Sequence, residues 1–198
     1  MQPQEMVAFF LFAVAAAITP GPSNLMVLAA GASAGWAGGL RCLSGVVLGM
    51  GLLMGVAAFG LAGVLQAWPG WLTAMRAAGS FFLLWLAWQI ASAPPMQAGH
   101  ELTPAGFRAA FLFQWVNPKS WVVSASAAAT FVAAPGQPAA THAMLLASIF
   151  ALAAAPSCAL WLAFGALLQR WMTDARRARA LYRTMGLLLA VSVAMLWI

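Results

Sequence analysis

The sequence predicts an all-α, polytopic membrane protein with six transmembrane helices, arranged as two inverted repeats of three helices each. The first observation is composition: of 198 residues, 64% are hydrophobic and only 6% are charged, with a mean hydropathy of +0.91. A soluble domain carries about 25% charged residues, so this chain has too few to cover a water-exposed surface. The second observation is a series of six apolar stretches. The third is a proline break inside the first and the fourth of them.

A spanning helix needs about 20 mostly apolar residues. The six predicted spans are Met6–Ala30, Arg41–Leu65, Trp71–Ser92, Ala105–Val132, Thr141–Leu168 and Ala180–Ile198. The sixth is the shortest, because only about 15 residues follow Arg183, which cover roughly 22 Å of helix. Arg179 and Arg183 would therefore have to extend their side chains to the membrane surface.

Arginines predict the orientation. With six spans, the first, third and fifth connections lie on one side, and those connections and the adjoining span ends hold nearly all the arginines. They are Arg41, Arg108, Arg170, Arg176, Arg177, Arg179 and Arg183. The positive-inside rule makes that side cytoplasmic, so both termini are predicted to be periplasmic. The net charge of +6 is thus explained by span ends, and no nucleic-acid partner is expected.

The chain is predicted to be a single transporter domain, 1–198, with two halves. Residues 93–103, which include Pro94 and Pro95, read as a surface loop. They separate repeat one, about 1–93, from repeat two, about 104–198. Because each half has an odd number of spans, equivalent halves must be inverted in the membrane.

Glycines recur at helical spacing in the second predicted span. Gly45 and Gly49, like Gly51 and Gly55, are four residues apart, and such pairs allow helix backbones to approach closely. Two readings remain open: tight packing within one subunit, or the contact face of a homodimer.

The two proline breaks have matching local sequences. The first is Thr19-Pro20-Gly21-Pro22 and the second is Asn117-Pro118-Lys119, with Pro20 and Pro118 98 positions apart. Proline removes a backbone donor and clashes with the preceding turn, so each span should be a broken helix. In a membrane, the freed backbone groups are tolerated only where protein or a polar cavity satisfies them. Paired interrupted spans in two halves point to a transporter's substrate site.

Each break is predicted to start a new half-helix. Thr19 and Asn117 are good N-caps, and proline suits the first helical position that follows. Helix starts attract anions such as a substrate carboxylate. The preceding half-helices should expose carbonyls that receive a substrate ammonium, near Ala17, Ile18, Trp115 and Val116. Together, the breaks offer what a zwitterionic amino acid needs.

The predicted substrate-binding residues flank the two breaks. They are Thr19, Pro20, Gly21, Pro22, Ser23, Asn24, Gln114, Asn117, Pro118 and Lys119. Lys119 is the one charged residue expected near the middle of a span, where a charge costs at least a few kcal/mol. It either assists carboxylate binding or bonds the broken-helix carbonyls as part of the structure.

The acidic residues limit the substrate class. Glu5, Glu101 and Asp174 are the only acids, and all lie at or outside predicted span ends. No carboxylate is thus available in the membrane to neutralise a cationic side chain, which favours small neutral amino acids. We predict no catalytic residue, metal site or cofactor.

Both breaks, in this order and spacing, resemble the two signatures of the lysine exporter (LysE/RhtB) family, and Leu84-Trp85-Leu86-Ala87-Trp88 resembles its third span. Phe113-Gln114-Trp115-Val116-Asn117 is most similar to the branch that exports cysteine and O-acetylserine. The resemblance covers essentially the whole chain and implies efflux of small neutral amino acids across the bacterial inner membrane. Many family members have an acid in the fifth span where this chain has Pro156-Ser157, so we infer no ion coupling from the resemblance.

Two other classes of protein remain as alternatives. A membrane thiol electron carrier would need Cys42 and Cys158 to meet, whereas Cys42 is expected near the cytoplasmic end of the second span and Cys158 deep in the fifth. A channel or scaffolding subunit is the other alternative.

Overall fold

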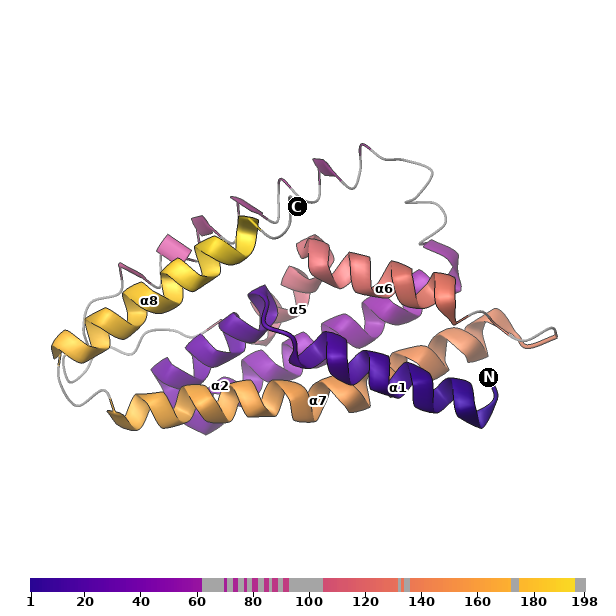
Figure 1. The fold of residues 1–198 in the computed structure, drawn as a ribbon, viewed down its shortest axis with the longest axis horizontal. Helices are drawn as coiled ribbons and strands as arrows, with labels where there is room; N and C mark the ends of the chain where they lie inside the picture. The colour runs from indigo at the N-terminus through magenta and orange to yellow at the C-terminus, as the bar shows by residue number, and fades with distance from the viewer. Residues whose placement is uncertain are drawn as a thin grey trace.

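The structure, a computed structural model, describes residues 1–61, 105–131, 133, 136–171 and 175–194, with scattered positions between 70 and 92. These residues form six α-helices, one π-helical turn and no strand. The elements are α1 (Pro3–Ile18), α2 (Pro22–Val56), η1 (Ala57–Leu61), α5 (Phe107–Val116), α6 (Pro118–Thr130), α7 (Ala139–Trp171) and α8 (Ala175–Ala194). Most of the helices run along the long axis of the molecule (Figure 1). The all-α prediction is confirmed for the described part of the chain.

The first predicted span is broken as expected, but its second half continues directly into the second span. Helix α1 ends at Ile18, and α2 begins at Pro22 and extends to Val56. Within α2, only Gly35 leaves the helical conformation, with φ 67° and ψ −167°. Glycine adopts a positive φ without steric cost. The predicted loop between the first two spans is therefore wrong, because a single glycine makes the bend.

Helix α2 thus consists of two arms, 22–34 and 36–56, that fold back beside each other (Figure 1). A Cβ atom added to Gly39 would lie 3.3 Å from the backbone nitrogen of Gly31. The arms therefore touch through two glycines placed on either side of the bend.

The fourth predicted span is confirmed as a broken helix. Helix α5 ends at Val116, α6 begins at Pro118, and Asn117 between them is extended, with φ −82° and ψ 109°. The third predicted span, Trp71–Ser92, lies mostly outside the described residues.

The last two predicted spans correspond to α7 and α8. Helix α7 contains Pro156 in its interior. Helix α8 starts at Ala175, five residues earlier than predicted, and has 20 residues, a length of about 30 Å. Alanine and arginine, which fill its first turns, favour helix. The added residues include Arg176, Arg177 and Arg179, so the apolar stretch of this span is no longer than predicted.

The core of the bundle is formed where α2 packs against α7 and α5. A Cβ atom on Gly49 would lie 2.8 Å from the carbonyl oxygen of Phe111 in α5, and one on Gly51 would lie 3.3 Å from that of Ala147 in α7. The glycine pairs of this arm therefore serve packing within one subunit. A homodimer remains a prediction.

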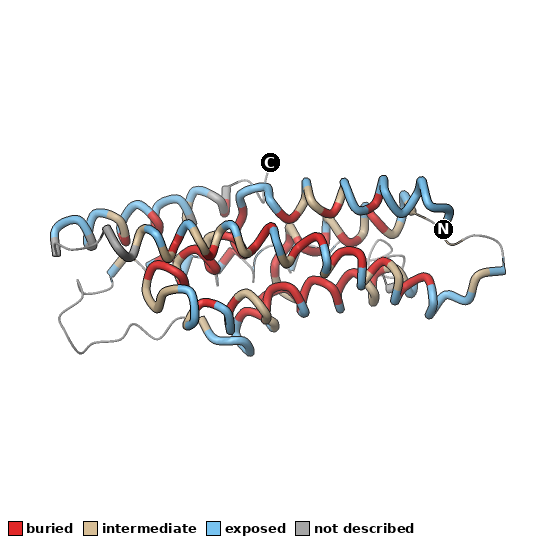
Figure 2. The backbone as a smooth tube through the Cα atoms, turned by 90° about the horizontal axis from the view of Figure 1, so that it is seen from below, coloured by how far each residue is buried: buried red, intermediate tan, exposed pale blue. Residues whose placement is uncertain are grey.

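The outer faces of the bundle are apolar. Buried residues follow the inner sides of the helices, and exposed ones the outer sides (Figure 2). Leu152 is 69% exposed and Leu187 is 63% exposed. By length and composition, residues Pro22–Gly60 and Ala139–Leu168 are long and apolar enough to cross a membrane. Large outward-facing apolar side chains suit a lipid environment.

Candidate functional site

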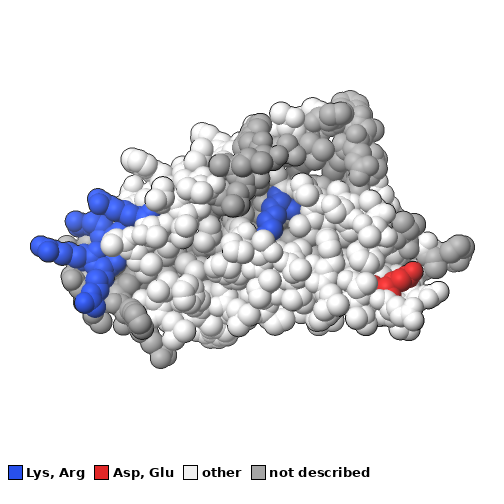
Figure 3. All heavy atoms as spheres, in the orientation of Figure 1, with Lys and Arg blue, Asp and Glu red and all other residues white. Residues whose placement is uncertain are grey.

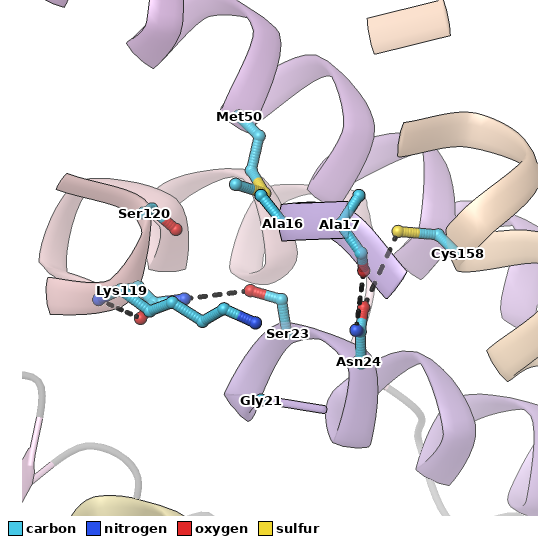
Figure 4. A pocket seen from close by; sticks show the side chains of 10 residues that line it. Ala16, Ala17, Gly21, Ser23, Asn24, Met50, Lys119, Ser120 and Cys158 are labelled. Carbon is cyan, nitrogen blue, oxygen red and sulfur yellow. Dashed lines mark hydrogen bonds between the residues drawn. The ribbon is translucent and has the colours of Figure 1, made fainter. Parts of the chain in front are cut away.

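The two breaks meet at one pocket (Figure 4). The Ser23 hydroxyl, in the first turn of α2, donates a hydrogen bond of 2.9 Å to Gln114 Oε1 in α5. Asn117 Nδ2 donates one of 3.0 Å to the Ser23 hydroxyl. Lys119 Nζ donates one of 2.7 Å to the carbonyl oxygen of Thr19. Residues nearly half a chain apart therefore form one polar cluster.

The prediction that Thr19 caps the second half-helix is wrong. Thr19 is the C-cap of α1 and donates its hydroxyl back to the carbonyl of Ala15, while Gly21 is the N-cap of α2 and makes no side-chain cap bond. The cause is Pro22, since the residue before a proline is disfavoured in the helical region. Gly21 is accordingly extended, with φ −177° and ψ 177°, and the helix cannot start at Pro20.

The second break follows the prediction. Asn117 is the N-cap of α6, and its side-chain oxygen accepts a hydrogen bond of 3.1 Å from the backbone nitrogen of Lys119. Pro118 is the first helical residue, where its missing N–H costs nothing.

Lys119 connects the two breaks. Besides Thr19, its ammonium contacts the carbonyl oxygen of Pro20 at 3.4 Å. A Cβ atom at Gly21 would lie only 3.0 Å from Lys119 Nζ, so glycine leaves the room that the lysine occupies. In this conformation, Lys119 binds the carbonyls at the end of α1, as its structural reading predicted. A carbonyl pair leaves the charge formally unneutralised.

The carbonyls expected to receive a substrate ammonium are largely occupied by the protein's own side chains. Asn24 Nδ2 donates to Ala17 at 2.8 Å and to Thr19 at 2.9 Å. Trp161 Nε1 donates to Ile18 at 3.2 Å. On the other side, Trp121 Nε1 donates to Trp115 at 2.7 Å. These bonds satisfy carbonyls left by the breaks, as buried backbone groups require. A carbonyl oxygen can accept a second bond, so the binding of a substrate ammonium by these carbonyls stays a prediction.

The amide of Asn24 is held with its oxygen towards the pocket. Both of its described donor bonds go to backbone carbonyls, which fixes the amide orientation. Its Oδ1 faces the thiol of Cys158 at 3.9 Å (Figure 4). A thiol is a weak donor, so Asn24 Oδ1 retains capacity to accept a stronger bond.

A second set of polar groups is buried on α5 and α6. Gln114 is completely buried, and its Oε1 also accepts from Ser120 at 3.0 Å. Its Nε2 donates to the carbonyl of Ala110 at 2.9 Å. Thr130 bonds the carbonyl of Ser126 in its own helix, and the buried Ser124 hydroxyl has no hydrogen-bond partner among the described residues. Gln114 therefore holds the pocket residues Ser23 and Ser120 in place without lining the pocket itself.

A pocket of about 20 Å³ lies at the junction of the two breaks, which is about the space that one water molecule needs. Its residues come from α1, both arms of α2, the second break and α7. They are Ala16, Ala17, Gly21, Ser23, Asn24, Met50, Asn117, Lys119, Ser120 and Cys158. None of them is acidic. In this conformation the pocket is too small for an amino acid.

Half of the predicted site residues line this pocket: Gly21, Ser23, Asn24, Asn117 and Lys119. Gln114, Pro22 and Pro118 are buried behind it, whereas Thr19 and Pro20 are exposed and contribute carbonyls. These placements do not test whether the residues bind substrate.

Sequence reasoning missed four lining residues: Ala16, Met50, Ser120 and Cys158. The fifth, Ala17, was predicted only for its carbonyl. Ser120 follows the second break directly, so its position in the first turn of α6 was available as a signal. Met50 and Cys158 carry no local signal, because only the packing of α2 on α7 brings them to the pocket.

The cysteines also differ from expectation. Gly39 of α2 packs against Leu162 of α7, while Gly51 packs against Ala151. This antiparallel register places Cys42 at the level of Cys158, and not at a different depth. Both are free thiols in the same buried core.

An apolar helical bundle with a polar pocket between two interrupted helices defines a class of protein, the membrane translocators. The comparison with known families agrees: residues 14–197 match the LysE type translocator model. The chain belongs to that family, and its task is transport across a membrane and not enzymatic conversion.

Curated relatives carry a more specific name. The cysteine/O-acetylserine efflux proteins of Escherichia coli strain K12, Escherichia coli O1:K1 and Shigella sonnei strain Ss046 are each 35% identical over 135 residues. Each alignment covers 67% of this chain and 68% of the relative. No solved structure matches the chain.

Proposed function

We propose that this protein exports small neutral amino acids or their derivatives, of the cysteine and O-acetylserine kind, across the bacterial inner membrane. The observation that carries the proposal is the pocket where both breaks meet, which holds one ammonium group and no carboxylate. The Lys119 ammonium therefore has no counter-ion among the described residues of the pocket, and the carboxylate of a zwitterionic amino acid supplies one. The name of the curated relatives supports the same class of substrate.

The substrate carboxylate binds Lys119 in this proposal. The ammonium now contacts two neutral carbonyls, at 2.7 Å and 3.4 Å. A carboxylate carries the full negative charge that the two carbonyls lack, and the attraction between opposite charges is strong away from bulk water, so it can draw Lys119 away from the end of α1. The first-turn amides of α2 and α6 add positive potential at the same place.

The substrate ammonium binds Asn24 Oδ1, which faces the pocket and, among the described residues, accepts only from a thiol at 3.9 Å. We favour it over the backbone carbonyls of the sequence prediction, which already accept bonds from the protein's own side chains. Asn24 and Lys119 come from different breaks, so one substrate molecule contacts both halves of the chain.

We infer that transport proceeds by alternating access, with one three-helix repeat moving against the inverted other. An aromatic cluster away from the pocket joins the halves. Phe131, the C-cap of α6, packs against Phe9 with 5.0 Å between ring centroids and against Phe12 with 6.0 Å, both in α1. This cluster must separate before the substrate can leave past the start of α1.

The charge distribution supports the proposed orientation. Basic side chains gather at the end of the molecule where α7 ends and α8 begins (Figure 3). The exposed arginines of α8 are Arg176, Arg177, Arg179 and Arg183. By the positive-inside rule that end is cytoplasmic. The start of α1, which carries Glu5, is at the opposite end (Figure 1) and is periplasmic.

A cytoplasm-only reporter fused to the C-terminus should therefore give no signal, and a strong signal would overturn the orientation.

Counterflow measures the proposed activity directly. Inside-out vesicles preloaded with unlabelled cysteine or O-acetylserine should take up the labelled compound transiently above equilibrium, as a carrier does and a channel does not. The amide of the amino acid, which lacks the carboxylate, and the analogue without the amino group should both fail to compete. Competition by either analogue would contradict the two-point binding, and uptake without counterflow would favour the channel.

A further inference from the structure

We propose that Met50 sets the upper size limit for the side chain of the transported amino acid. The inference rests on the proposed function, since it concerns the part of the pocket that remains after the carboxylate and the ammonium have been placed.

The pocket has a polar side and an apolar side. Ser23, Asn24, Asn117, Lys119 and Ser120 supply the polar side. The apolar side consists of Ala16, Ala17, Met50 and Cys158, and Met50 reaches into it from the second arm of α2 towards Ala16 (Figure 4). An amino acid bound by both charged groups must direct its side chain to this apolar side. Met50 is the largest residue there.

The backbone at Met50 has no room to recede. A Cβ atom on the preceding Gly49 would lie 2.8 Å from Phe111 of α5, and one on the following Gly51 would lie 3.3 Å from Ala151 of α7. The helix is thus clamped from two sides at the positions next to Met50. Close-packed interiors do not yield gradually, so extra volume for a substrate must come from the Met50 side chain itself.

The methionine side chain can supply a limited volume. Met50 is buried, with 8% of its surface exposed, but a methionine side chain is unbranched and flexible, so it can turn aside for a small side chain. It cannot vacate the pocket, because the glycine contacts hold its Cα in place. The pocket of about 20 Å³ must therefore widen far enough for cysteine-sized substrates but not for leucine-sized ones.

The test is the selectivity of Met50→Ala. The change removes about three heavy atoms, which is what leucine adds to alanine, and one methylene in an apolar pocket changes selectivity about tenfold or more. In counterflow with the full-length protein in liposomes, leucine should compete at least about tenfold better, relative to cysteine, than with the wild type. Met50→Leu, which conserves volume, should keep the wild-type ratio.

Met54→Ala is the matched control. Met54 lies one turn further along the same arm, is completely buried, and does not line the pocket. This variant loses the same atoms from the core and should lower thermal stability without changing the leucine-to-cysteine ratio.

The outcomes separate the two proposals. If the wild type shows no counterflow with any neutral amino acid, the proposed function fails and this inference fails with it. If the wild type transports cysteine while Met50→Ala, folded and active, keeps the wild-type ratio, only the role of Met50 is refuted. An equal change of ratio in Met54→Ala would also refute it, by showing a general loosening of the core.

Discussion

At the first break a proline stands on each side of Gly21, whereas at the second break a single proline follows Asn117. This difference decides what each break offers to the pocket. Pro22 keeps Gly21 extended and delays the start of α2, so the first break exposes the carbonyls of Thr19 and Pro20. At the second break the helix restarts immediately, and its side chains face the first break.

The two breaks are therefore complementary rather than equivalent. The first supplies the carbonyl acceptors that bind Lys119, and the second supplies the donors Asn117 Nδ2 and Lys119 Nζ; one bond runs the other way, from Ser23 to Gln114. Hydrogen bonds that involve a charged group contribute about 1.5–3 kcal/mol, against about 0.5–1.5 kcal/mol for neutral ones. The contact through Lys119 should thus be the strongest link between the breaks, and also the link that a substrate carboxylate replaces.

The largest effect is expected for Lys119→Ala. This variant removes the only ammonium that lines the described pocket, so efflux should fall at least about tenfold, the loss that follows from 1.4 kcal/mol or more of binding free energy. The measurement is efflux of labelled cysteine from cells, together with the amount of protein in the membrane. Arg108→Ala, which removes an exposed charge from α5, is the control and should transport normally. Normal efflux by Lys119→Ala would leave Lys119 with a purely structural role.

The caps of the two breaks should differ in stability. Asn117→Ala removes the N-cap bond to Lys119 and the bond to Ser23, and should cost about 1–3 kcal/mol of unfolding free energy. Thr19→Ala removes one exposed bond to the carbonyl of Ala15, and should cost less than about 0.5 kcal/mol. Thermal unfolding of the purified variants in detergent measures both. Equal losses would mean that Thr19 supports the break as much as Asn117 does.

The aromatic cluster tests whether the halves also separate away from the breaks. Phe131→Ala removes the ring that joins α6 to Phe9 and Phe12 of α1. In a Cys42→Ser background, it should raise labelling of Cys158 by an impermeant maleimide from the periplasmic side several-fold, because the closed conformation loses a contact worth about 0.5–1.5 kcal/mol.

The control for this experiment is Phe107→Ala. Phe107 stacks with Phe111 of the same helix, with 5.8 Å between ring centroids. Removing its ring therefore breaks no aromatic contact between the described parts of the two halves. Unchanged labelling in Phe131→Ala, or an equal increase in Phe107→Ala, would show that the cluster does not close the periplasmic side.

The breaks were predictable from the sequence because proline acts on its immediate neighbours. The position of the cap at Asn117 followed from the same local rule, and the failure at Thr19 came from overlooking Pro22, whose effect is equally local. The bend at Gly35 was harder to predict, since a glycine in a helical stretch does not reveal whether the helix continues or bends there. Met50 and Cys158 were beyond sequence reasoning, because the register of α2 on α7 depends on glycine contacts between distant segments.

The smallest effect is expected for the cysteines. The register of α2 on α7 brings Cys42 to the level of Cys158, so their positions alone do not exclude thiol chemistry, and a direct test is needed. The double variant Cys42→Ser, Cys158→Ser should transport within about twofold of the wild type, because serine is close to cysteine in shape and the thiol contact with Asn24 Oδ1 at 3.9 Å is weak. Transport and counterflow of labelled cysteine give the comparison. Complete loss of transport by a double variant that is still present in the membrane would favour the thiol electron carrier. The two breaks would then serve to hold the cysteine pair in place.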